Sequence, residues 1–300
     1  MATTYTYSAF GINISSEIKI PEFIPSSGDI QVTVSYGEVP KKLDEKIING
    51  FRFQISADEF IIRYKPWAAF YVCNGNKIII QPEKDADEND IKTFLISSVI
   101  VMLLHQRGLL PLHASGIKVD NKAVLFAANA GVGKSTIALD LNRKYGYPLI
   151  ADDVTVVSAI NNLPVVYSSF PSAKLWQDSI EMLGLLNKDL PFIRKDVFKY
   201  RFDNRPAFFS GILEPLLIFV IENGDKENIE IQEIKGVDKF NVLRQHIFRA
   251  KMINEIYAVE HFKILTQLLK SVSCFKILKH NNSNTLNELS VTIQDTIKQW

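Results

Sequence analysis

One stretch of the sequence constrains the fold more than any other: residues 125–136, which read LFAANAGVGKST. Its first residues are apolar and β-prone, and glycines follow at positions 131 and 133, where a backbone without a Cβ can turn sharply. From position 135 onward, apolar residues recur with helical spacing, namely Ile137, Ala138 and Leu141. This order predicts a buried strand, a tight turn and a helix, which together direct several backbone N–H groups toward one point.

A turn of this kind binds phosphate, because free N–H groups and the positive end of a helix dipole meet there. Lys134 adds a positive charge for the β- and γ-phosphates, and the Ser135 hydroxyl can be a ligand of Mg²⁺. The pattern G-x-x-x-x-G-K-[ST] is met except at its first position, where Ala128 replaces glycine. A chance glycine-rich turn is the alternative, but the flanking strand and helix favour binding of a nucleoside triphosphate. The predicted nucleotide-binding residues are Asn129, Ala130, Gly131, Val132, Gly133, Lys134, Ser135 and Thr136.

Composition narrows the classes of protein that remain. The 300 residues are 47% hydrophobic and 22% charged, which suits a globular chain with one large domain or two smaller ones. A net charge of +1 gives no reason to expect a nucleic-acid partner. Cys73 and Cys274 are predicted to be buried thiols without a disulfide. We see no signal peptide, and the longest apolar run, 94–104, is too short to cross a membrane, so we expect a cytoplasmic protein.

The chain divides in sequence near position 85. Residues 1–85 contain short β-prone runs between turn signals, of which Asn74-Gly75 is the clearest hairpin signal. An acidic cluster at 85–90 precedes an apolar run, and we interpret it as the start of a helix over 88–106 rather than as a metal site. We therefore predict a β-rich N-terminal part, 1–85, and an α/β domain, 86–300, joined by that helix.

Candidate catalytic groups stand on both sides of the phosphate-binding stretch. His113 lies in the apolar run 109–117, and a hairpin would place it on a strand beside the phosphate-binding strand; a buried structural histidine is the alternative. Asp152 and Asp153 end a predicted strand, 147–151, where an acid that binds magnesium is expected in nucleotide-binding α/β folds. We place that strand beside the phosphate-binding strand, with a solvated turn as the alternative.

Together, these residues resemble the catalytic domain of HPr kinase/phosphorylase. The match runs over about 109–160 and rests on LHASGIKVDNKAVLFAANAGVGKST and on LIADDVTVV. The chain is more similar still to HPr-kinase-like proteins found beside peptide-tailoring genes, some of which phosphorylate lasso-peptide precursors. That broader likeness includes residues 10–18, 103–108 and 175–178. The resemblance implies an α/β fold with a P-loop domain related to the nucleotide domain of phosphoenolpyruvate carboxykinase.

The resemblance also implies roles for individual residues. His113 matches the family's active-site histidine, Lys134 its P-loop lysine, and Ser135 its magnesium ligand. Asp153 matches the aspartate that takes the proton from the substrate serine, and we assign Asp152 to metal or water positioning. We find no counterpart of the family's Arg-containing PGRN segment, so neither phosphorylase activity nor HPr as the substrate is implied.

A basic segment, 191–205, has two interpretations. Its cations could reach a substrate phosphate or an acidic peptide, or they could simply cover solvated strand faces, which we favour. They are Arg194, Lys195, Lys199, Arg201 and Arg205.

We therefore expect a kinase that uses ATP and Mg²⁺ to phosphorylate a serine hydroxyl of a peptide or small protein. The alternatives are a kinase of small hydroxylated metabolites and a nucleotide-binding regulatory module with little turnover. His113 and the two aspartates argue against the regulatory module, because binding alone requires neither. The identity of the acceptor and the oligomeric state do not follow from the sequence.

Overall fold

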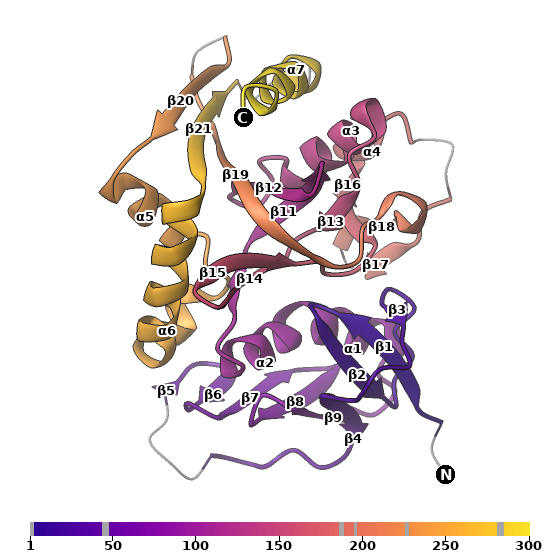
Figure 1. Ribbon diagram of the computed structural model, residues 1–300. Coiled ribbons are helices and arrows are strands. Elements are labelled where there is room, and N and C mark those ends of the chain that lie inside the picture. Colours follow the sequence, from indigo (N-terminus) through magenta and orange to yellow (C-terminus); the bar gives the residue numbers. More distant parts are fainter. Residues whose placement is uncertain (1–2, 44–47, 186–188, 195–196, 226–227, 281–284) are drawn as a thin grey trace.

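A computed structural model describes residues 3–43, 48–185, 189–194, 197–225, 228–280 and 285–300. Over these residues the protein is a mixed α/β fold with three sheets, in which a β-rich N-terminal part packs against a larger α/β part (Figure 1). No helix in these ranges is long and apolar enough to span a membrane. Cys73 and Cys274 are both buried free thiols, as predicted.

The N-terminal sheet has nine strands in the order β3-β1-β2-β4-β9-β8-β7-β6-β5. The predicted Asn74-Gly75 turn joins β8 to β9, with φ of 54° and 61° at its two central residues. These positive φ values favour Asn and Gly, which explains the turn. The strands are β1 Tyr5–Ala9, β2 Ile12–Ser16, β3 Ile24–Pro25, β4 Val32–Tyr36, β5 Ile48–Asn49, β6 Phe53–Ile55, β7 Glu59–Tyr64, β8 Ala68–Cys73 and β9 Lys77–Pro82.

The predicted helix over 88–106 is present, but a π-helical turn interrupts it. It consists of α1 (Glu88–Phe94), the π turn (Leu95–Val99) and α2 (Ile100–Gln106), and the chain leaves it at Gly108 with φ of +68°. The Asp87 side chain caps it by accepting a hydrogen bond from the backbone N–H of Asn89. The helix is mostly buried, and its core cluster includes residues of both parts of the protein.

The second sheet carries the predicted strand–turn–helix. Its main path runs β10-β14-β15-β19-β12-β11-β13, and β21 also pairs with β19 and with β20. Strand β19 is central and runs parallel to both β12 and β21. The strands are β10 Leu110–Leu112, β11 Ala114–Val119, β12 Lys122–Ala128, β13 Leu149–Ala151, β14 Thr155–Ile160, β15 Leu163–Tyr167, β19 Ile212–Asn223, β20 Glu230–Ile234 and β21 Ser273–Lys279.

Strand β12 is buried on both faces because helices cover both sides of the sheet. Val124 and Phe126 belong to a cluster with α3 (Lys134–Tyr145) and α7 (Leu286–Ile297), whereas Leu125 faces the cluster that contains α6 (Ala250–Ser271). This alternation is the two-residue period of a strand. It explains why β12 is a continuous apolar run in the sequence.

A small third sheet lies beside the second one, in the order β16-β18-β17. Its register pairs Lys174 with Arg201 and Trp176 with Lys199, so these side chains share one face. The strands are β16 Ser172–Trp176, β17 Phe192–Arg194 and β18 Val197–Asp203. The remaining helices are α4 Gln177–Met182, α5 Val237–Arg244 and a 3₁₀ turn at Arg205–Ala207.

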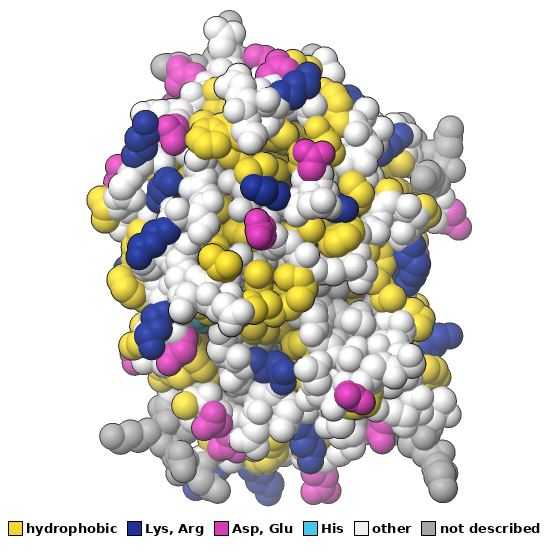
Figure 2. Space-filling view, in the orientation of Figure 1, with side chains coloured by type: hydrophobic (Ala, Val, Ile, Leu, Met, Phe, Trp, Pro, Cys, Tyr) yellow, Lys and Arg dark blue, Asp and Glu magenta, His cyan; other side chains and the backbone are white. Residues whose placement is uncertain are grey.

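Charged side chains of both signs are interspersed over the face seen in Figure 2. The described residues of that face form no continuous basic stripe of the kind that tracks a nucleic-acid backbone.

Candidate functional site

The loop between β12 and α3, residues 129–133, is named here the glycine turn. Gly131 and Gly133 have φ of +85° and +116°, and a Cβ at either position would meet no atom within 4 Å. The backbone conformation, and not lack of space, therefore requires glycine there. The N-cap of α3, Gly133, has no side chain to cap the helix, so among the described residues its leading N–H groups have no capping side-chain acceptor. Such groups are available to an anion.

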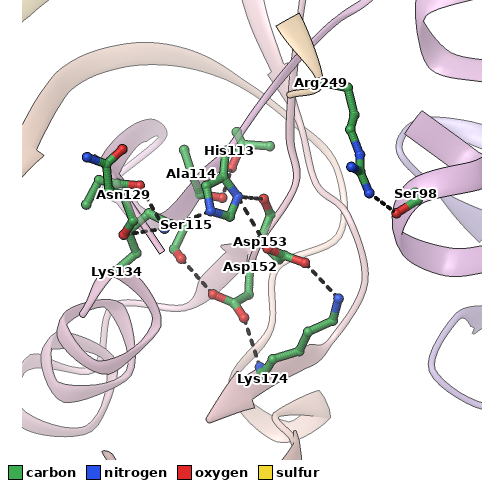
Figure 3. Close-up of polar contacts among 12 residues, drawn as sticks. Ser98, His113, Ala114, Ser115, Asn129, Lys134, Asp152, Asp153, Lys174 and Arg249 are labelled. Carbon is green, nitrogen blue, oxygen red and sulfur yellow. Dashed lines mark hydrogen bonds and ion pairs between the residues drawn. The ribbon is translucent and has the colours of Figure 1, made fainter. Parts of the chain in front are cut away.

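Lys134 is the first residue of α3 and bends back over the glycine turn (Figure 3). Its Nζ donates to the Ala128 carbonyl at 2.9 Å and to His113 Nε2 at 3.1 Å. Burial lowers the pKa of the Lys134 ammonium, and the carboxylates of Asp152 and Asp153 oppose that shift. At position 128 the acceptor for Lys134 is the backbone carbonyl, which every residue type has. Alanine can therefore replace glycine there without loss of this contact.

His113 lies at a bend between β10 and β11 and not within a strand, which corrects the sequence-based placement. The chain leaves β10, which pairs with β14, to enter β11, which pairs with β12, and this change of partner requires the bend. Because His113 Nε2 accepts from Lys134, we assign the ring proton to Nδ1. Nδ1 faces Asp153, 3.1 Å from its backbone oxygen and 3.3 Å from Oδ1.

Asp152 and Asp153, named here the aspartate pair, follow β13 as predicted, but β13 is not beside β12. Strand β11 lies between them, because the turn at 120–121 makes β11 the neighbour of β12 on one side and β19 occupies the other side. Strand β13 pairs antiparallel with β11, as β12 does, so β12 and β13 run in the same direction. Their carboxyl ends therefore reach the same edge of the sheet.

Protein donors already contact both oxygens of the Asp152 carboxylate. The Ser115 hydroxyl donates to Oδ1 at 2.6 Å, and the backbone N–H of Lys174 donates to Oδ2 at 2.9 Å. Asp152 is only 2% exposed. Each carboxylate oxygen keeps a further lone pair, through which it could still hold a metal ion or a water molecule.

Asp153 is held in a left-handed backbone conformation, with φ of +66°. Its Oδ2 forms an ion pair with Lys174 Nζ at 2.7 Å. Burial raises the pKa of the Asp153 carboxyl, but Lys174 and His113 outweigh burial and hold that pKa well below its usual value. Asp153 is therefore ionised at neutral pH.

The structure brings two further lysines to the site. Sequence reasoning missed Lys174, and it named Lys199 among the cations of 191–205 but favoured a solvated strand face for it. The Lys199 ammonium lies over the Trp176 ring, 4.6 Å from its centroid. Burial lowers the pKa of Lys199, while Asp153 and Asp152 raise it and Lys174 lowers it further. In β18, Tyr200 and Phe202 pack against the core. Because successive residues of a strand point to opposite faces, this pattern could have indicated that Lys199 points away from that core.

The favoured interpretation of 191–205 as solvated strand faces is wrong for three of its cations. Besides Lys199, Arg194 lies 4.7 Å from the ring centroid of Trp67, and Arg201 pairs with the buried Glu22. Arg205 is exposed and pairs with Asp203. Lys195 lies outside the described residues.

A cavity of about 1150 Å³ opens beside the glycine turn. Gly131 and Gly133 line it, together with residues of α4 and the first residues of α7. Thr136 in α3 donates to the Ser179 hydroxyl in α4 at 2.8 Å, which ties the two walls together. The volume is sufficient for a nucleotide-sized ligand.

No group of three or more His, Cys, Asp or Glu side chains in the described part of the chain is arranged to hold a metal ion alone. Mg²⁺ bound with a nucleotide needs fewer protein ligands, because phosphate oxygens and water complete its shell. The half-buried Ser135 hydroxyl and the aspartate pair are oxygen donors of the required kind.

Comparisons with known proteins do not assign a family. No protein-family model matches the chain, and no curated protein sequence matches it. Among solved structures, the chain is similar to the HPr(Ser) kinase/phosphatase from Coxiella burnetii, with a TM-score of 0.33 and 16% identity over 63% of this chain and 99% of that chain. A similarity at this level does not establish membership of that family, so the chemistry rests on the residues described above.

Proposed function

We propose that this protein is an ATP-dependent kinase that phosphorylates a serine hydroxyl of a peptide or small protein. One observation supports this most: Lys134, His113 and Asp153 form a continuous chain of contacts at the edge where β12 and β13 end. A cation that can meet phosphate is thereby joined through an imidazole to an ionised carboxylate. Phosphoryl transfer to a hydroxyl requires both of these groups.

In this proposal the glycine turn and the first turn of α3 are the phosphate-binding loop, formed by residues 129–136. Their N–H groups hold phosphate oxygens, and Lys134 neutralises charge on the β- and γ-phosphates. The cavity beside the turn receives the nucleoside. Ser135 and Asp152 would hold Mg²⁺, which when bound supplies further positive charge at the phosphates.

Asp153 receives the acceptor hydroxyl. The hydroxyl oxygen forms a bond to the γ-phosphorus while the bond from that phosphorus to the β–γ bridging oxygen breaks, so ADP departs with its electron pair. The hydroxyl proton passes to Asp153. A carboxylate of low pKa is a weak base, but it suffices because phosphoryl transfer depends mostly on positioning and charge. His113 orients Asp153 through its Nδ1–H.

Two other functions use the same residues differently. A kinase of small hydroxylated metabolites would have the same chemistry with another acceptor. A regulatory module would bind nucleotide with little turnover, and it would not need the contact between His113 and Asp153.

The test is transfer of label from γ-³²P-ATP, with Mg²⁺, to serine-containing peptides encoded by genes adjacent to this one. We expect phosphoserine in wild-type reactions and none with Lys134→Ala. Labelled peptide with both proteins would show that another site or a contaminant is responsible. Nucleotide binding without any labelled peptide or metabolite would favour the regulatory module.

A further inference from the structure

The three-stranded sheet contributes two cations to the site, and the proposed function does not use either. Lys174 is anchored twice on the aspartate pair: its backbone N–H donates to Asp152 and its ammonium pairs with Asp153 (Figure 3). Its side chain therefore cannot turn to solvent without breaking a 2.7 Å ion pair. Strand β16 is thus fixed against the edge where the glycine turn lies.

Lys199 reaches the same region from β18. It is the cross-strand partner of Trp176, and it shares a sheet face with Lys174. The indole of Trp176 supports its ammonium through a cation–π contact at 4.6 Å. Among the described residues, no carboxylate lies within ion-pair distance of Lys199. A cation that is partly withdrawn from water and has no paired anion is stabilised when a ligand provides the anion.

Charge counting leads to the same conclusion. Lys134, Lys174 and Lys199, named here the lysine cluster, carry three positive charges, while the aspartate pair carries two negative charges. His113 adds none, because its Nε2 accepts from Lys134. The site is therefore one negative charge short. The positive charge of Lys199 lowers the pKa of Lys134, that of Lys174 lowers the pKa of Lys199, and the same two aspartates raise the pKa of both lysines.

We propose that Lys174 and Lys199 form a second cationic arm that binds the terminal phosphate of ATP from the side opposite the glycine turn. This inference rests on the proposed function. Lys174 has three donors, so it can keep Asp153 and still donate to a phosphate oxygen. Lys199 supplies the charge that the aspartate pair does not neutralise. The arm would act on the γ-phosphate, and the lysines would not contact the adenosine.

The test compares binding of ATP and ADP, each with Mg²⁺, by titration calorimetry. Lys174→Met and Lys199→Met should each weaken ATP binding roughly tenfold or more, as loss of a charged hydrogen bond does, and leave ADP binding unchanged. Lys199→Arg should keep the preference for ATP. The matched control is Lys235→Met. It removes a lysine that lies far from the site and whose side chain is 77% exposed. Circular dichroism checks that each variant is folded.

The outcomes separate the two proposals. If the wild-type protein binds neither nucleotide, the proposed function fails, and this inference fails with it. If the wild-type protein prefers ATP and the folded methionine variants keep that preference, only the inference is overturned. Equal loss of ATP and ADP affinity would also overturn it, because the lysines would then serve a part of the nucleotide that both ligands share.

Discussion

A buried histidine pair between α2 and α6 should make the protein sensitive to acid. His105 Nε2 donates to the carbonyl of Phe248 at 3.0 Å, so its Nδ1 accepts from His261 Nε2, also at 3.0 Å. The Tyr257 ring stacks on His105, and the Phe248 ring lies edge-on against His113. The pair therefore supports the segment that holds the candidate catalytic histidine.

The magnitude follows from the pKa values. Burial, followed by the neighbouring His261, lowers the pKa of His105 to about 3, and burial lowers the pKa of His261 to about 4, with Glu260 opposing. The unfolded chain titrates near its ordinary value of about 6.5, so it takes up protons first as the pH falls. The contribution of this pair to stability is complete above about pH 6.5 and is lost progressively as the pH falls to about 3, the pKa of folded His105. Between pH 7 and pH 5 each histidine should cost about 2 kcal/mol.

The perturbation is His261→Gln, whose amide can still donate to His105 Nδ1 but cannot titrate. Urea unfolding at pH 7 and pH 5 gives the change in free energy of unfolding for each protein. The variant should lose about 2 kcal/mol less than wild type over this interval. His246, whose pKa burial lowers to about 4, contributes equally to both proteins and cancels. Equal pH dependence in the two proteins would refute the assignment of buried neutral histidines.

Three further predictions concern the glycine turn and its neighbours. Lys134→Ala and Ser135→Ala should each abolish phosphoryl transfer without unfolding the protein; a variant with normal turnover and magnesium dependence would contradict the site. Ala128→Gly should leave ATP affinity unchanged in calorimetry, because the Ala128 carbonyl and not its methyl contacts Lys134; a large loss would reveal an essential packing role for the methyl. Asp153→Asn should slow transfer by roughly two to four orders of magnitude with little change in ATP affinity, because asparagine cannot take the proton. Rescue of that variant by excess Mg²⁺ would instead assign Asp153 to the metal.

Local sequence signals were sufficient to predict several individual elements. The apolar run 122–128, the glycines at 131 and 133 and the helical spacing after 134 act over a few residues, so strand, turn and helix follow in order. The Asn74-Gly75 hairpin and the extent of the helix over 88–106 are predictable for the same reason. The closeness of His113, Lys134 and Asp153 was also expected, from two separate sequence stretches, although the expected strand neighbours differ from the observed ones.

Only the tertiary structure decided which strands from distant parts of the sequence are neighbours. Strand β13 is separated from β12 by β11, and His113 lies at a bend, because strand pairing depends on competition between segments far apart in the chain. The same long-range pairing sets Lys199 beside Trp176 and brings Lys174 to Asp153. A lysine on a solvated strand and a lysine in a binding site have the same local sequence pattern. The difference lies in the groups that the fold places beside each ammonium, which are the Asp153 carboxylate for Lys174 and the Trp176 ring for Lys199.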